Sequence, residues 1–127
     1  MEKYYLLLSS MIFLHIVDDY YLQGWLASAK QKSWWKSNAP DKMYSHDYIA
    51  ALFMHSFSWT FMISLPPTIY TIFFGGSIFP ILFIGNVLLH MLVDNEKANR
   101  KTINLITDQS IHMLQILWLW YCTVKWK

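Results

Sequence analysis

Long apolar stretches separated by short clusters of charge are the feature of this 127-residue sequence that most restricts its fold. Only 14% of the residues are charged and 55% are hydrophobic, whereas about a quarter of an ordinary soluble domain is charged. The charges gather in residues 30–47, in residues 94–101 and in the last three positions. A membrane-spanning helix needs about 20 mostly apolar residues. The pattern therefore predicts an all-α, polytopic membrane protein formed by a single domain, residues 1–127.

Four segments are long enough for such helices, and we expect a four-transmembrane-helix bundle. The segments are residues 4–25, 46–74, 77–94 and 103–124. Pro66 and Pro67 should kink the second segment or end its regular part, and Gly75-Gly76 should turn the chain into the third. A signal peptide is the competing interpretation of residues 1–29, but acidic residues after the apolar run are not typical of one.

Basic residues are divided unevenly between the loops that would join these helices, and this bias predicts the orientation. The first and third loops hold Lys30, Lys32, Lys36, Lys42, Lys97, Arg100 and Lys101, against Lys3, Lys125 and Lys127 on the opposite side. We therefore expect both termini outside a bacterial inner membrane. The net charge of +2 and the lack of a basic stripe argue against a nucleic-acid partner. Cys122 stands alone, which excludes an internal disulfide.

Three of the predicted helices each carry one histidine and one aspartate four residues apart. The pairs are His15 with Asp19, His90 with Asp94, and Asp108 with His112. Residues four apart share one helix face. With the orientation above and a rise of about 1.5 Å per residue, all three pairs fall in the cytoplasmic half of the bilayer. His55 reaches the same layer, and polar groups at this depth usually mark a functional site.

Imidazole and carboxylate groups together are the ligand set of divalent ions such as Zn²⁺, Mn²⁺ and Fe²⁺. We predict a site for one or two such ions, with His15, Asp19, His55, His90, Asp94, Asp108 and His112 as candidate ligands. An aspartate among Asp19, Asp94 and Asp108 that is not a ligand would act as general base. Gln23 and Gln109 would contact a ligand or the substrate. The competing interpretation is that each pair is a structural hydrogen bond between helices.

The order of these motifs resembles an uncharacterised family of small bacterial and phage integral membrane proteins. Its pattern is H-x3-D-x3-Q followed by a lysine, then a histidine in the second helix, H-x3-D-x2-K and D-Q-x2-H. The matching segments are HIVDDYYLQGWLASAK, MHSF, HMLVDNEK and DQSIH, and they cover nearly the whole chain. The resemblance selects the seven candidate ligands with Gln23, Lys30, Lys97 and Gln109, and omits Asp18, His46 and Asp47. The family is also similar, more weakly, to inner-membrane proteins with a metal-dependent hydrolase label.

These observations predict a membrane-embedded, metal-dependent hydrolase. Its substrate would be a lipid or a lipid-linked molecule, including phosphate-containing ones, near the cytoplasmic face. A metal-bound water is nucleophilic near neutral pH, and nearby cations would hold an anionic headgroup. Those cations are Lys30, Lys97, Arg100 and Lys101. The alternatives are a divalent-cation or proton transport component, and a phage or bacterial interaction protein with a structural metal site. Homo-oligomerisation stays open.

Overall fold

The computed structural model describes residues 1–77 and 80–126, and in these residues the regular structure is helical. The elements are α1 (Glu2–Ile16), η1 (Val17–Leu22), α2 (Leu26–Ala29), α3 (Lys32–Asn38), η2 (Lys42–Tyr44), α4 (Asp47–Phe74), α5 (Pro80–Asn95), η3 (Glu96–Arg100) and α6 (Leu105–Lys125). Of these, η1 and η3 are π-helical and η2 is a 3₁₀ turn. The all-α part of the predicted fold is therefore confirmed.

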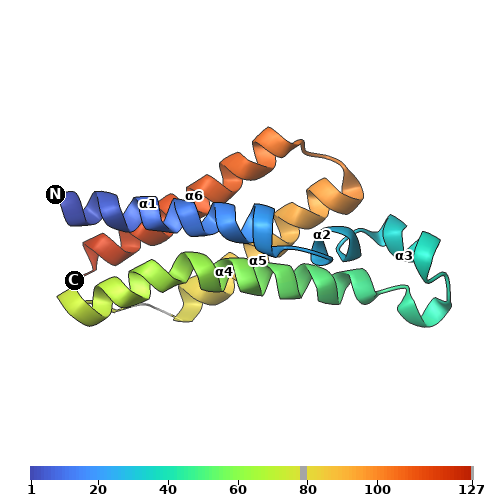
Figure 1. Ribbon diagram of the computed structural model, residues 1–127, viewed down its shortest axis with the longest axis horizontal. Coiled ribbons are helices and arrows are strands. Elements are labelled where there is room, and N and C mark those ends of the chain that lie inside the picture. The colour runs from blue at the N-terminus through green and yellow to red at the C-terminus, as the bar shows by residue number, and fades with distance from the viewer. Residues whose placement is uncertain (78–79, 127) are drawn as a thin grey trace.

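The long helices α1, α4, α5 and α6 run along the length of the molecule (Figure 1). Both chain termini lie at one end, and the short helices α2 and α3 lie at the other (Figure 1). Helix α4 contacts α1, α5 and α6, so it organises the packing of the bundle.

The core beside the termini is built from apolar residues three or four positions apart on three helices. Leu7 and Met11 come from α1, Trp59 and Ile63 from α4, and Ile116 from α6, all nearly inaccessible to solvent. This spacing places each pair on one helix face. Burying such a side chain contributes about 1.5–3 kcal/mol. The core therefore holds α1, α4 and α6 together and fixes the polar residues that lie next to it on the same helix faces.

Helix α4 continues through both prolines and does not end near residue 65. It ends at Gly75, which has a φ of 79°, and Gly76 follows with a φ of 116°. These dihedrals favour glycine, because other residues rarely adopt positive φ. The turn expected at the two glycines therefore occurs where the sequence predicted it.

The prediction of four membrane-spanning helices is wrong. Among the described residues, one helical segment, Lys42–Phe74, is long and apolar enough to cross a membrane. One such segment is weak evidence, since the core helix of a soluble protein can have the same length and composition. Helices α1 and α5 continue directly into η1 and η3, so these helical runs cover residues 2–22 and 80–100. They reach the length of about 20 residues that a span requires, but their charged and polar residues lower the hydropathy. Helix α6 has 21 residues, but its buried polar side chains lower its hydropathy. The predicted orientation, with both termini outside the membrane, assumed four spans and is therefore no longer supported.

Candidate metal site

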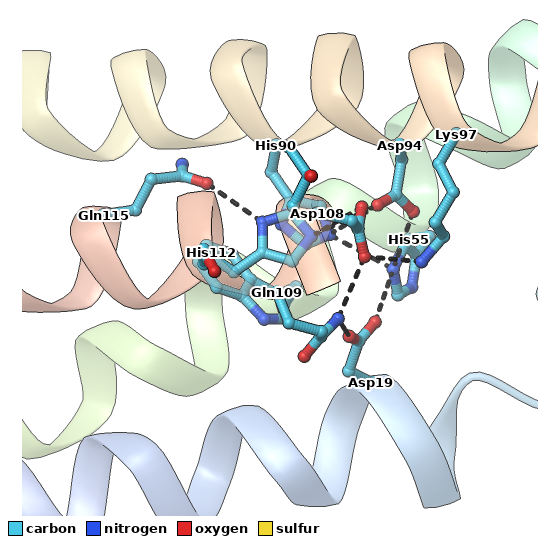
Figure 2. Close-up of polar contacts among 12 residues, drawn as sticks. Asp19, His55, His90, Asp94, Lys97, Asp108, Gln109, His112 and Gln115 are labelled. Atoms are coloured by element: carbon cyan, nitrogen blue, oxygen red, sulfur yellow. Dashed lines mark hydrogen bonds and ion pairs between the residues drawn. The ribbon is translucent and has the colours of Figure 1, made fainter. Parts of the chain in front are cut away.

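Six of the seven predicted ligands converge in the interior of the bundle. Asp19 comes from η1, His55 from α4, His90 and Asp94 from α5, and Asp108 and His112 from α6. Figure 2 shows these side chains pointing toward one another between the helices. Each is at most 7% exposed. The site is therefore assembled from segments that lie far apart in the sequence.

Two π-helical segments lie directly at this cluster. Asp19 belongs to η1, while η3 begins two residues after Asp94 and contains Lys97. In a π-helix each amide bonds to the fifth preceding residue instead of the fourth, and such segments are frequent at functional sites. Both Asp18 and its neighbour Asp19 are buried in this segment. The periodicity of a regular α-helix places Asp18 and Asp19 on different faces, so it does not predict that both are buried.

Two overlapping groups of ligand atoms have the spacing required to hold a metal ion. The first contains Asp19, His55 and His90, and the second contains His90, Asp94 and His112. Within each group the atoms lie within 4.8 Å of one another. His90 belongs to both groups, and it directs its Nε2 atom toward both His55 Nε2, at 3.2 Å, and Asp94 Oδ1, at 3.7 Å. Because one nitrogen binds one ion, the two groups cannot both be filled with all three ligands.

The second group contains unsatisfied buried atoms that fit a metal ion. Asp94 Oδ1 lies 3.4 Å from His112 Nε2, and neither atom has a hydrogen-bond partner among the described residues. A charge-assisted N–H···O bond is about 2.7–2.9 Å long, so this contact is too long for a good one. Two ligands about 2.05 Å from a tetrahedral zinc ion are about 3.3 Å apart. The geometry thus fits two ligands of one ion better than a direct hydrogen bond.

The outer oxygen of each aspartate is held from outside the cluster, while the inner oxygen faces an imidazole. Oδ2 of Asp94 accepts a hydrogen bond from Lys30 at 2.6 Å. Oδ2 of Asp108 accepts from Lys97 at 2.5 Å and from Gln109 at 3.0 Å. Oδ2 of Asp19 accepts from Gln109 at 2.9 Å. Such partners orient the ligands of metal sites. Asp108 belongs to neither group, although its Oδ1 lies 3.3 Å from His112 Nε2.

The charges of the cluster also balance without a metal ion. Burial lowers the pKa of His112, but its contacts with Asp108 and Asp94 outweigh this effect and raise the pKa to about 9. Burial raises the pKa of Asp94, yet its close contacts with the imidazoles of His112 and His55 hold that pKa well below its usual value. Burial also lowers the pKa of His55, but its contacts with Asp19 and Asp94 outweigh this effect and raise the pKa. Two lysines and protonated imidazoles can therefore offset the carboxylates. A buried network of ion pairs is thus the alternative to a metal site.

His90 and His112 are further fixed by neighbours that the sequence analysis did not assign. The indole ring of Trp59 stacks on His90 with ring centroids 4.1 Å apart, and His90 stacks on His112 at 4.0 Å. Gln115 Oε1 lies 3.2 Å from His112 Nδ1, and its amide nitrogen donates to Asn86. The H-x2-Q spacing of His112 and Gln115 is the signal that was available in the sequence.

His15, a predicted ligand, lies beside the cluster without joining either group. Its Nδ1 accepts a hydrogen bond from Trp59 Nε1 at 2.7 Å, and its Nε2 lies 3.0 Å from Gln109 Oε1. Both ring nitrogens are therefore engaged by protein groups. Gln23, predicted to contact the site, donates instead to the main-chain oxygen of Asp19 at 2.7 Å.

The four cations predicted to hold a headgroup occupy different environments. Lys30 is buried against Asp94, and the side chain of Lys97 is 26% exposed. Arg100 is exposed and pairs with Glu96. Lys101 is exposed and ends η3 in the left-handed region, with a φ of 56°.

Residue Asn99 secures the segment that carries Lys30. Its side-chain amide donates to the main-chain oxygen of Lys30 at 3.0 Å, and its oxygen accepts from the amide of Lys32 at 2.6 Å. On the other side of the cluster, the hydroxyl of Ser58 donates to Asp18 Oδ1 at 2.6 Å. Asp18 was set aside in the sequence analysis, but it is buried and joins η1 to α4.

Comparison with known proteins identifies the family of the chain. The family model described as "Protein of unknown function (DUF3307)" matches residues 7–127. No curated protein and no solved structure gives a match. The matched range includes all seven predicted ligands and confirms the expected membership of an uncharacterised family. The chain belongs to the DUF3307 family.

Proposed function

We propose that this protein binds a divalent ion of the Zn, Mn or Fe type through His90, Asp94 and His112, and that it uses this ion for hydrolysis. The observation that carries the proposal is the pair of buried atoms, Asp94 Oδ1 and His112 Nε2, that face each other without a hydrogen-bond partner among the described residues. Three protein ligands with a remaining open position are typical of catalytic zinc sites.

Asp108 is the residue that we assign as general base. A bound ion of this type lowers the pKa of a coordinated water toward neutrality. Asp108 lies in neither ligand group, its Oδ1 is buried and lacks a hydrogen-bond partner among the described residues, and Lys97 holds its other oxygen. A carboxylate kept beside the ligands in this way is placed to accept a proton. Asp19 and His55 would serve a second ion.

Exposed apolar side chains support a lipid or lipid-linked substrate, including one that contains phosphate. All four long helices expose large apolar residues, among them Phe13, Phe73, Leu92 and Ile106 at 63–76%. Soluble monomers rarely expose extensive apolar surface of this kind. Contact with a lipid bilayer, in particular the bacterial inner membrane, is therefore part of the proposal. The partly exposed Lys97 would face the anionic part of the substrate.

A metal site that only stabilises the fold is the second candidate. The observation in its favour is burial, since His90, Asp94 and His112 are all inaccessible to solvent. In that case the ion would raise the stability of the protein without any turnover.

Elemental analysis of the purified protein tests metal binding. We expect bound metal in the wild type and in His46→Ala, a control outside the cluster: His46 is exposed, and its ring lies 2.9 Å from the hydroxyl of Ser45. We expect none in Asp94→Asn or His112→Ala. Equal metal content in all four proteins would refute the ligand assignment.

Turnover is tested on the metal-loaded protein with phospholipids and polyprenyl phosphates. Hydrolysis that is lost in Asp108→Asn, while metal remains bound, would support the assigned general base. Metal that raises the melting temperature without hydrolysis of any substrate would favour the structural site instead.

A further inference from the structure

A chain of hydrogen bonds with a forced direction begins at Trp59. The indole Nε1–H is a donor only, and it lies 2.7 Å from His15 Nδ1. His15 Nδ1 must therefore accept and carry no proton. A neutral imidazole then holds its proton on Nε2. Trp59 and His15 are both essentially inaccessible to solvent, so water does not replace this bond.

The same direction follows independently from the other end of the chain. Gln109 Nε2 lies 2.9 Å from Asp19 Oδ2 and 3.0 Å from Asp108 Oδ2. Carboxylates only accept hydrogen bonds, so the amide nitrogen of Gln109 must face them, as Figure 2 shows. Its oxygen then faces His15 Nε2 at 3.0 Å and requires a donor there. Both ends thus demand the Nε2–H tautomer of His15.

We infer that Trp59, His15 and Gln109 form a hydrogen-bond relay of fixed direction that positions the carboxylates of Asp19 and Asp108, with His15 acting as a neutral positioning residue instead of a metal ligand. A protonated His15 would direct a second N–H group at the indole N–H. A metal ion on His15 Nε2 would displace Gln109. Either change would break the relay.

The relay affects the proposed metal site through the aspartate oxygens. Gln109 occupies Oδ2 of both carboxylates, which leaves Oδ1 of Asp19 3.4 Å from His55 and Oδ1 of Asp108 3.3 Å from His112. Asp108 is also held by Lys97. Within residues 1–77 and 80–126, Gln109 is the one side-chain donor to Asp19 Oδ2. Asp19 therefore depends more on the relay than Asp108 does.

Nitrogen NMR of histidine-labelled protein tests the tautomer and does not depend on metal binding. In the metal-free protein we expect His15 to show an unprotonated Nδ1 and a protonated Nε2. Addition of Zn²⁺ should shift the ring nitrogens of His90 and His112 and leave those of His15 unchanged. A protonated Nδ1, or a zinc-induced shift at His15, would overturn the inference. If the wild type binds no metal, the proposed function fails, but the tautomer still decides whether the relay exists.

Two substitutions of His15 separate positioning from packing, and this second test rests on the proposed metal site. His15→Gln keeps an acceptor for Trp59 and a donor for Gln109, whereas His15→Leu keeps only bulk. Asp19, with His55, would hold the second ion of the proposed site. Because loss of such orienting partners typically weakens metal binding about 10–100-fold, we expect this loss of affinity for the second zinc ion in His15→Leu and near wild-type affinity in His15→Gln. Met11→Ala, a buried core control on the same helix, should lower stability and leave zinc affinity unchanged.

Two outcomes of this comparison would overturn the relay. If His15→Gln loses zinc as fully as His15→Leu, the imidazole itself is required as a ligand. If His15→Leu behaves like Met11→Ala, with lower stability and unchanged zinc affinity, His15 serves packing alone.

Discussion

Replacing Lys30 by methionine should destabilise the metal-free protein severely. The Lys30 ammonium lies 2.6 Å from Asp94 Oδ2, and the two side chains are only 7% and 1% exposed. Removing one partner of a buried ion pair costs about 3–5 kcal/mol, because the other charge remains buried and uncompensated. Unfolding entropy scales as about 2.1 cal/mol/K per residue, so a chain of this length should lose about 11–19 °C in melting temperature.

A metal ion should offset much of this loss. Asp94 is also a proposed ligand, and a divalent cation beside it would replace the charge that Lys30 supplied. Ligand at 100 times its dissociation constant stabilises a protein by about 2.7 kcal/mol, or about 10 °C here by the same scaling. We therefore expect zinc to raise the melting temperature more in Lys30→Met than in the wild type. Thermal unfolding followed by circular dichroism, with zinc and with chelator, measures both effects.

The double variant Lys30→Met/Asp94→Asn is the matched control. It removes both charges, so its metal-free stability should recover toward that of the wild type, while its response to zinc should disappear. Our interpretation of the pair is wrong if Lys30→Met melts like the wild type in chelator. It is equally wrong if the double variant is no more stable than the single one.

Three further predictions concern other parts of the structure. In chelator, the pKa of His112 is raised to about 9, against about 6.5 in the unfolded chain. This shift contributes about 3 kcal/mol to the free energy of unfolding, fully present below pH 6.5 and lost as the pH rises through 9. Equal free energies of unfolding from denaturant titrations at pH 6.5 and 9.5 would contradict this. Asn99→Ala removes the hydrogen bonds from Asn99 to the segment that carries Lys30. It should lower the free energy of unfolding, measured by denaturant titration, by about 1–3 kcal/mol. An unchanged free energy of unfolding would show that Asn99 does not hold this segment. Gly85 lies inside α5, and a Cβ added there meets no atom of the described residues within 4 Å. Gly85→Ala should therefore raise the free energy of unfolding by about 0.5–1 kcal/mol. A lower melting temperature would show that there is no room for the added methyl group.

The convergence of His90, Asp94 and His112 was predictable because four-residue spacing fixes the face of a helix on which side chains lie. The role of His15 was not, since Trp59 lies 44 residues further along the chain and periodicity does not identify a partner on another helix. The contact between Asn99 and the main-chain oxygen of Lys30 was not predictable either, because the two residues lie 69 positions apart. The four predicted spans failed because polar and charged residues inside three of the helical runs lower their hydropathy, which the long apolar stretches between them concealed.

The spread of the ligands along the chain has a consequence for biosynthesis. Asp19 belongs to η1, which continues the first long helix, and His112 belongs to the last long helix, α6; residues between them complete both candidate ligand groups. A nascent chain that stops before α6 lacks His112, so no partial product holds the full set. Metal retained through His90, Asp94 and His112 would therefore report that α5 and α6 have docked against each other, so ion content would measure this late step of assembly in variants and truncations.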